Sequence, residues 1–134
     1  MDKTKVNLNE IRVFENFNIE QLEFGHVILS TEVTSFSLNY YDITHGGYLF
    51  TLCDQMGGLI ARSTGVDSVT SQATINYLKP GFLGDKLFVE GILLHNGRST
   101  QVVEATVKNE KGTLLTKATL TMFNTKKSEK KVLN

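Results

Sequence analysis

Apolar and polar residues alternate along most of the chain, on both sides of one continuous apolar segment. Before that segment, alternation predicts strands over Phe17–Phe24 and Val27–Leu38, the second rich in Thr, Ser and Val. After it, period-two patterns predict strands over Ser68–Lys79, Lys86–His95, Ser99–Lys108 and Thr113–Asn124. A further segment, Asn7–Asn16, has a capping Asn and spaced apolar residues, which predict a short helix.

The apolar segment itself is predicted to be one long helix. It begins at Gly46 or Gly47 and runs to about Arg62 or Ser63, and Gly65 ends it. The order of two strands, one helix and about four more strands predicts an α+β fold, with the helix on one face of an antiparallel sheet.

The length of 134 residues fits a single domain covering 1–134. We expect about 1–12 to be an N-terminal extension and 125–134 to be a charged tail.

The predicted helix has two unlike faces around a carboxylate, Asp54. At about 100° per residue, the side of Asp54 holds mostly small residues, namely Gly47, Phe50, Thr51, Gly57, Gly58 and Ala61. The opposite side is the expected sheet-packing face and holds Leu49, Leu52, Met56 and Leu59. Each helical Gly costs roughly 0.5–1 kcal/mol against Ala, so another backbone, a subunit or a ligand is expected to approach there. The alternative is a helix kink at Gly57 and Gly58, with Asp54 bonded to a neighbouring hydroxyl.

The start of the helix is a second candidate for chemistry. Gly46-Gly47 provides unpaired N–H groups at the positive end of the helix dipole. Such a site binds an anion, or an oxygen that becomes negative in a transition state. With a carboxylate about two turns further on, this helix start suggests hydrolysis of an acyl compound.

Composition narrows the classes of partner. The 14 basic and 14 acidic residues balance, which argues against nucleic acid or an anionic membrane as a partner. The lone cysteine, Cys53, excludes an intrachain disulfide and favours a buried structural thiol in a reducing cytoplasm. No signal peptide or membrane span is expected. No metal is expected either, because His26, His45 and His95 show no ligand spacing with Cys53.

One stretch of the sequence resembles a known family. The run HGGYLFTLCD resembles the His-Gly-Gly…Asp signature of the PaaI-like (phenylacetate-degradation type) hotdog-fold acyl-CoA thioesterases. The Asp of that signature falls on Asp54, the family Asn six positions before His45 falls on Asn39, and a Ser/Thr position falls on Thr70. The segments TINYLKPGFLGDKL and HNGRST are also similar to that family, and the resemblance covers roughly 14–124. The loop NYYDITHGG lacks a Gly that many relatives carry, which bears on substrate choice.

The resemblance implies a fold and an assembly. The long central helix would be wrapped by a curved antiparallel sheet of about six strands. Two protomers would pair edge to edge as a homodimer, and two dimers would associate into a tetramer. Asp54 of one chain would then face the Gly47 N–H of the other.

The resemblance also implies roles for the residues. The substrate would be an acyl-CoA thioester, so that coenzyme A is part of the substrate and no separate cofactor is needed. The Gly47 N–H would polarise the thioester carbonyl, and Asp54 would act as general base or as nucleophile. Asn39 would hold the water or the carbonyl, and Thr70 would bond the water or Asp54. His45 would hold loop geometry or contact the thioester.

Further residues are candidates for substrate binding. Gly46 belongs to the helix start, and Lys79 and Arg98 are candidates for the CoA phosphates. Tyr48, Tyr77 and Phe82 are candidates to line the acyl or pantetheine channel. The alternatives are solvated surface charges for the basic residues and core positions for the aromatic ones.

Two other functions are compatible with the same fold. One is a hotdog hydratase or dehydratase acting on acyl-CoA or acyl carrier protein, but such enzymes place their His differently, with an Asp or Glu. The other is a non-catalytic acyl-CoA sensor, against which Asp54, Asn39 and Thr70 together argue.

Overall fold

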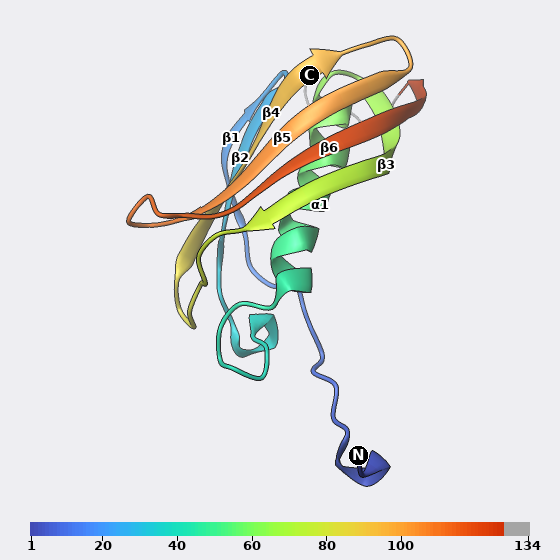
Figure 1. Ribbon diagram of the computed structural model, residues 1–134. Coiled ribbons are helices and arrows are strands. Elements are labelled where there is room, and N and C mark those ends of the chain that lie inside the picture. Colours follow the sequence, from blue (N-terminus) through green and yellow to red (C-terminus); the bar gives the residue numbers. More distant parts are fainter. Residues whose placement is uncertain (128–134) are drawn as a thin grey trace.

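The computed structural model describes residues 1–127 and contains one long helix lying along one face of an antiparallel sheet (Figure 1). The helix, α1, spans Gly46–Ser63, and the sheet has six strands in the order β1-β2-β4-β5-β6-β3. The strands are β1 Asn18–Glu23, β2 His26–Glu32, β3 Val66–Tyr77, β4 Lys86–Asn96, β5 Thr100–Asn109 and β6 Leu114–Lys127. The predicted α+β hotdog architecture is therefore confirmed, including the long helix and its bounds.

Hydrophobic burial between α1 and the sheet holds the fold together. Leu49, Leu52, Met56 and Ile60 of the helix are all buried, and they meet buried residues from β2, β4, β5 and β6. Burying one such side chain contributes about 1.5–3 kcal/mol. The helix ends where predicted, because Gly65 takes a φ of 89° and its N–H donates to the Arg62 carbonyl.

The predicted division of the helix into two faces is partly wrong. Gly57 and Ala61, assigned to the face of Asp54, are buried inside the protomer, whereas Leu59 is only partly buried. The reason is that β6 reaches round the helix, so that Met122 and Leu120 pack over Gly57. The remaining stripe that is not fully buried includes Gly47, Thr51, Asp54, Gln55, Gly58 and Arg62.

The N-terminal part of the chain also differs from expectation. Asn7–Asn16 forms no helix; the only helical turn there is the 3-10 turn Lys3–Lys5. Tertiary contacts fix the segment instead, because the Arg12 N–H donates to the Phe36 carbonyl at 3.0 Å and its guanidinium lies 4.0 Å from the Phe36 ring centre. Figure 1 shows the chain before this point running away from the sheet.

The sequence pattern also predicted two strand ends at the wrong residues. The strand predicted over Val27–Leu38 stops at Glu32, because Thr34 caps a 3-10 turn, Ser35–Ser37. β6 continues to Lys127, into the predicted charged tail; the rest of that tail, 128–134, lies outside the described residues.

β3 is an edge strand, and a β-bulge near its middle changes which side chains face the helix. Thr70 pairs with Met122 of β6, but the next paired residue of β3 is Gln72, so Ser71 is the extra residue. In a regular strand with Ser71 included in the pairing, Thr70 and Ala73 would be three positions apart and would point to opposite faces. With the bulge, both lie opposite buried β6 residues and face α1.

Candidate active site

The middle of α1 and the bulge of β3 place a hydroxyl against a carboxylate. Thr70 Oγ1 donates a hydrogen bond of 2.8 Å to Asp54 Oδ1. Asp54 is partly exposed, so its charge keeps contact with solvent and gains one donor. Within residues 1–127, Asp54 Oδ2 has no hydrogen-bond partner. The expected pairing of Thr70 with Asp54 is thus present, with one carboxylate oxygen open.

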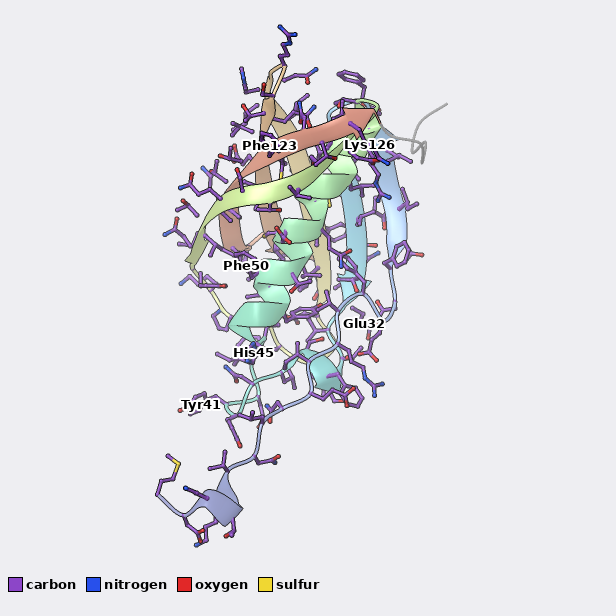
Figure 2. All side chains as sticks on the ribbon, turned by 90° about the vertical axis from the view of Figure 1, so that its right-hand side faces the viewer. Glu32, Tyr41, His45, Phe50, Phe123 and Lys126 are labelled. Atoms are coloured by element: carbon purple, nitrogen blue, oxygen red, sulfur yellow. The ribbon has the colours of Figure 1, made fainter. Side chains whose placement is uncertain are left out.

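The start of α1 is closed by its own capping residue. His45 is the N-cap, and its Nδ1 accepts a hydrogen bond of 2.9 Å from the Gly47 N–H. A neutral ring that accepts at Nδ1 carries its proton on Nε2. Figure 2 shows His45 at the base of the helix, with Tyr41 in the loop below it. The predicted carbonyl donor is therefore already bonded inside the protomer, and His45 holds local geometry as one of its two expected roles.

Asn39 shapes the loop that leads into the helix. Its Oδ1 accepts from the Tyr41 N–H at 2.8 Å and from the Ile43 N–H at 3.3 Å, and its own carbonyl accepts from the Asp42 N–H. Asp42 takes a φ of 59° in this tight loop. Asn39 makes no hydrogen bond with Asp54 in the same protomer.

Three of the expected binding residues meet beside the helix start. Tyr77, at the end of β3, donates from its hydroxyl to the Gly46 carbonyl at 3.1 Å. Burial raises the pKa of Tyr77, with a smaller contribution from the nearby Cys53, so this hydroxyl remains a donor at neutral pH. A cavity of about 320 Å³ lies here, lined mainly by apolar residues and by Gly46, Tyr77 and Lys79.

The remaining expected binding residues lie elsewhere. Tyr48 is 1% exposed in the core, so it lines no channel in the protomer, and burial raises the pKa of its hydroxyl. Phe82 is half exposed in the turn after β3, where its N–H donates to Asp85. Arg98 is exposed in the β4–β5 turn, near the other end of the helix. A hydrogen bond from Gln101 of β5 to Thr64, just after the helix, connects this turn to that end.

Cys53 precedes Asp54 in sequence but lies on the buried side of the helix. It is 1% exposed, and burial, followed by the charge of Asp54, raises its pKa to about 12. A thiol in that state is a poor nucleophile at neutral pH. The expectation of a structural thiol matches this position.

Neither a metal-binding cluster nor a membrane-spanning helix is found in the described part of the chain. No group of three or more His, Cys, Asp or Glu residues within 1–127 is placed to hold a metal ion. Over the same residues, no helix is both long and apolar enough to cross a membrane.

Known proteins share this sequence pattern. The family described as the thioesterase superfamily matches residues 41–116, which include Asp54 and Thr70. The chain belongs to the thioesterase superfamily. The resemblance to PaaI-like acyl-CoA thioesterases, based on the His-Gly-Gly…Asp signature, is therefore confirmed at the level of the family.

Individual members of the thioesterase superfamily resemble the chain over most of its length. Acyl-coenzyme A thioesterase PaaI of Escherichia coli (strain K12) is 33% identical over 93 residues, which are 69% of this chain and 66% of that protein. The crystal structure of a hypothetical thioesterase with coenzyme A from Streptococcus pneumoniae TIGR4 is 48% identical, with a TM-score of 0.91. It covers 92% of this chain and 100% of the other.

Further solved thioesterases bear on the site. A Streptococcus mutans UA159 protein bound to acetyl CoA is 56% identical with a TM-score of 0.84, over 92% of this chain and 100% of that one. The Streptococcus pneumoniae protein has also been solved with one Asp changed to Ala and, separately, with one Thr changed to Ala.

Sequence patterns alone missed three structural features of the candidate site. The capping bond of His45 to Gly47 follows a known signal, a polar residue directly before a helix, but was not predicted. The bulge at Ser71 and the packing of Met122 against Gly57 depend on the pairing of β3 with β6, for which the sequence carries no local signal.

Proposed function

We propose that this chain hydrolyses acyl-CoA thioesters to a free acid and coenzyme A, with Asp54 as the reacting carboxylate. The hydrogen bond from Thr70 to Asp54 Oδ1 carries the proposal, because it orients the carboxylate and leaves Oδ2 for a water molecule. Coenzyme A and acetyl CoA in the two streptococcal structures support the substrate class. The Asp and Thr replaced in the Streptococcus pneumoniae protein are 16 residues apart, as Asp54 and Thr70 are.

The proposed site requires two copies of the chain. Gly47 and Asp54 lie on one helix, about 10 Å apart along its axis at 1.5 Å per residue. A carbonyl held by the Gly47 N–H and a water held by Asp54 must lie within about 3 Å of each other. Because the two groups lie this far apart on one helix, we propose that they act from different chains. A homodimer joined through the free edge of β3 supplies Gly47 from one chain and Asp54 from the other, and two dimers are proposed to form a tetramer.

The proposed reaction follows from these groups. Asp54 Oδ2 removes a proton from water, the water oxygen bonds to the thioester carbonyl carbon, and the carbonyl oxygen gains negative charge. The partner's Gly47 N–H stabilises that charge once the thioester oxygen displaces His45 Nδ1 as its acceptor. The C–S bond then breaks, and the sulfur leaves with the proton from Asp54. If Asp54 Oδ2 attacks the carbonyl carbon instead, the C–S bond breaks, the CoA thiolate leaves and an acyl anhydride forms. After a single turnover in ¹⁸O-water, label in Asp54 reports this route with water attack at the Asp54 carbonyl.

Substrate contacts are proposed for the residues beside the helix start. Gly46, Tyr77 and Lys79 border the 320 Å³ cavity, which suits part of the acyl or pantetheine chain. The exposed Phe82 and Arg98 remain candidates for contact with the pantetheine and the phosphates. Asn39 is proposed to hold the loop before α1 with its side-chain oxygen and to bind the water or the carbonyl with its amide nitrogen. Tyr48 is left out of the proposed site because it is a core residue.

A panel of acyl-CoA substrates with detection of free thiol tests the proposal. Thiol release from at least one substrate, lost in Asp54→Ala, is expected. Water addition to an enoyl-CoA without thiol release would instead identify a hydratase. Tight acyl-CoA binding with no product would identify a sensor and overturn the assignment.

A further inference from the structure

A packed pair, Gly57 of α1 and Met122 of β6, lies beneath the Thr70–Asp54 hydrogen bond. We infer that Gly57 and Met122 are positioning residues that hold Thr70 in the orientation in which its hydroxyl reaches Asp54. This inference rests on the proposed function, because it assigns the support of the same site. Neither residue carries a group that reacts with a thioester, so both act through Thr70.

Met122 touches the hydroxyl that bonds Asp54. It lies opposite Thr70 in the β3–β6 pairing and is 1% exposed, and its Sδ lies 3.6 Å from Thr70 Oγ1. A thioether is a weak acceptor and a carboxylate a strong one, so the Thr70 proton goes to Asp54. Met122 therefore acts mainly by shape. It fills the space beneath Thr70 and restricts the rotamers that the threonine side chain adopts.

Gly57 provides the space that Met122 occupies. A Cβ at Gly57 would lie 2.6 Å from Met122 Sδ and 3.0 Å from its Cε, closer than real Cβ contacts come. Glycine weakens a helix interior relative to alanine, so its presence here needs a reason, and the thioether supplies one. The neighbouring Gly58 has nothing within 4 Å of such a Cβ, so of these two adjacent glycines only Gly57 makes the close contact.

These contacts form one connected path from the helix to the carboxylate. Gly57 and Asp54 lie on adjacent turns of α1, three residues apart, and Met122 and Thr70 are cross-strand neighbours. A group added at Gly57 displaces the end of the Met122 side chain, which is flexible enough to move without unfolding the core. The displaced thioether then disturbs Thr70 and, through it, Asp54.

The first experiment compares Gly57→Ala with a matched control, Gly91→Ala. A Cβ at Gly91 meets Ile60 Cγ1 at 2.9 Å and Met56 Cε at 3.0 Å, so it crowds the core to a similar degree but away from Thr70. We expect kcat of Gly57→Ala to fall on the order of 10-fold with KM nearly unchanged, and kcat of Gly91→Ala to stay near wild type. Equal kcat values in the two variants, at matched thermal stability, would overturn the inference.

A double-mutant cycle separates positioning from general damage. In a Thr70→Ala background, Gly57→Ala is expected to have no further effect on kcat, because the hydroxyl that it misplaces is absent. Met122→Val combined with Gly57→Ala is expected to recover part of kcat, since valine ends at Cγ and lacks the Sδ and Cε atoms that clash. Full additivity of Gly57→Ala with Thr70→Ala would contradict the inference.

Failure of this inference is distinguishable from failure of the proposed function. If wild type releases no thiol from any acyl-CoA, or Asp54→Ala is as active as wild type, the proposed function falls. If wild type releases thiol and Asp54→Ala does not, but the Gly57 and Gly91 variants behave alike, only the positioning role falls. Should Gly57→Ala not fold, Met122→Leu measured with and without Thr70→Ala gives the same cycle, and full additivity of those two substitutions would likewise remove the positioning role.

Discussion

The middle and the start of α1 differ in how far each is prepared for the proposed reaction. In the middle, Thr70 of another element holds one oxygen of Asp54 and leaves the second open. At the start, His45 already accepts the Gly47 N–H that a thioester oxygen would need. The first arrangement is made by tertiary packing, and the second by a cap two residues away in sequence. The difference indicates that Asp54 is set before substrate arrives, whereas the helix start must exchange one acceptor for another.

The largest expected effect is at the prepared carboxylate. Asp54→Asn keeps the shape and an oxygen that accepts from Thr70 but removes the base, so kcat should fall by about 10²–10⁴-fold with the fold intact. Steady-state thiol release and circular dichroism measure the two parts. Turnover near wild type in a folded Asp54→Asn protein would remove Asp54 from the chemistry.

The next effect concerns the hydroxyl that orients this carboxylate. Thr70→Ala removes a hydrogen bond to a charged group, and kcat should fall by about 10- to 100-fold. Thr70→Ser restores the hydroxyl and should recover most of the loss, which makes it the matched control. If both variants lose activity equally, the threonine methyl matters more than the bond to Asp54.

A smaller effect on kcat is expected at the helix start. His45→Ala removes the cap, and the stability should fall by about 0.5–2 kcal/mol, measured by denaturant unfolding. The backbone donor at Gly47 remains, so kcat should fall less than in Thr70→Ala, and His45→Asn should restore part of the stability. A loss of kcat as large as in Asp54→Asn would instead show that the His45 ring itself takes part in the reaction.

The smallest effect on activity is expected at Cys53, the neighbour of Asp54 on the buried side of the helix. Its pKa near 12 keeps the thiol protonated, so an aromatic disulfide reagent at pH 8 should label unfolded but not folded protein. Cys53→Ala should keep a kcat near wild type. Rapid labelling of the folded protein would contradict the buried position.

The same thiol has a consequence for stability at high pH. Its pKa is raised in the folded state, from 9.0 to about 12, so its contribution is complete below pH 9 and is lost as pH rises toward 12. Urea midpoints should therefore fall more steeply over this range in wild type than in Cys53→Ala. Parallel curves would mean that other groups account for the alkaline loss.

Local patterns in the sequence predicted the elements whose periodicity is regular. The long helix and the later strands follow from apolar periodicity. The N-terminal segment does not, because Arg12 is placed by Phe36, a contact that no local pattern encodes. For the same reason, placing residues at about 100° per residue assigned Gly57 to the open face of the helix. That projection describes a helix alone and not the strands that curve round it.

The sequence predicted the residues of the candidate site better than it predicted the contacts between them. The pairing of Thr70 with Asp54 was among the expected contacts, and it is present. The bond between His45 and Gly47 was not expected, although it is local, and it changes what the helix start must do on binding. Asn39 was expected near the reacting atoms, but in one protomer its side-chain oxygen is used to build its own loop.

The bulge at Ser71 bears on any attempt to move this site into another protein. It makes β3 two half-strands that are out of phase, with Thr70 belonging to one half and Ala73 to the other. If the native sequence of β3 were grafted onto a regular strand, either Thr70 or Ala73 would point away from the helix. The smallest transferable unit is therefore the bulged strand together with the stretch of β6 that pairs with it.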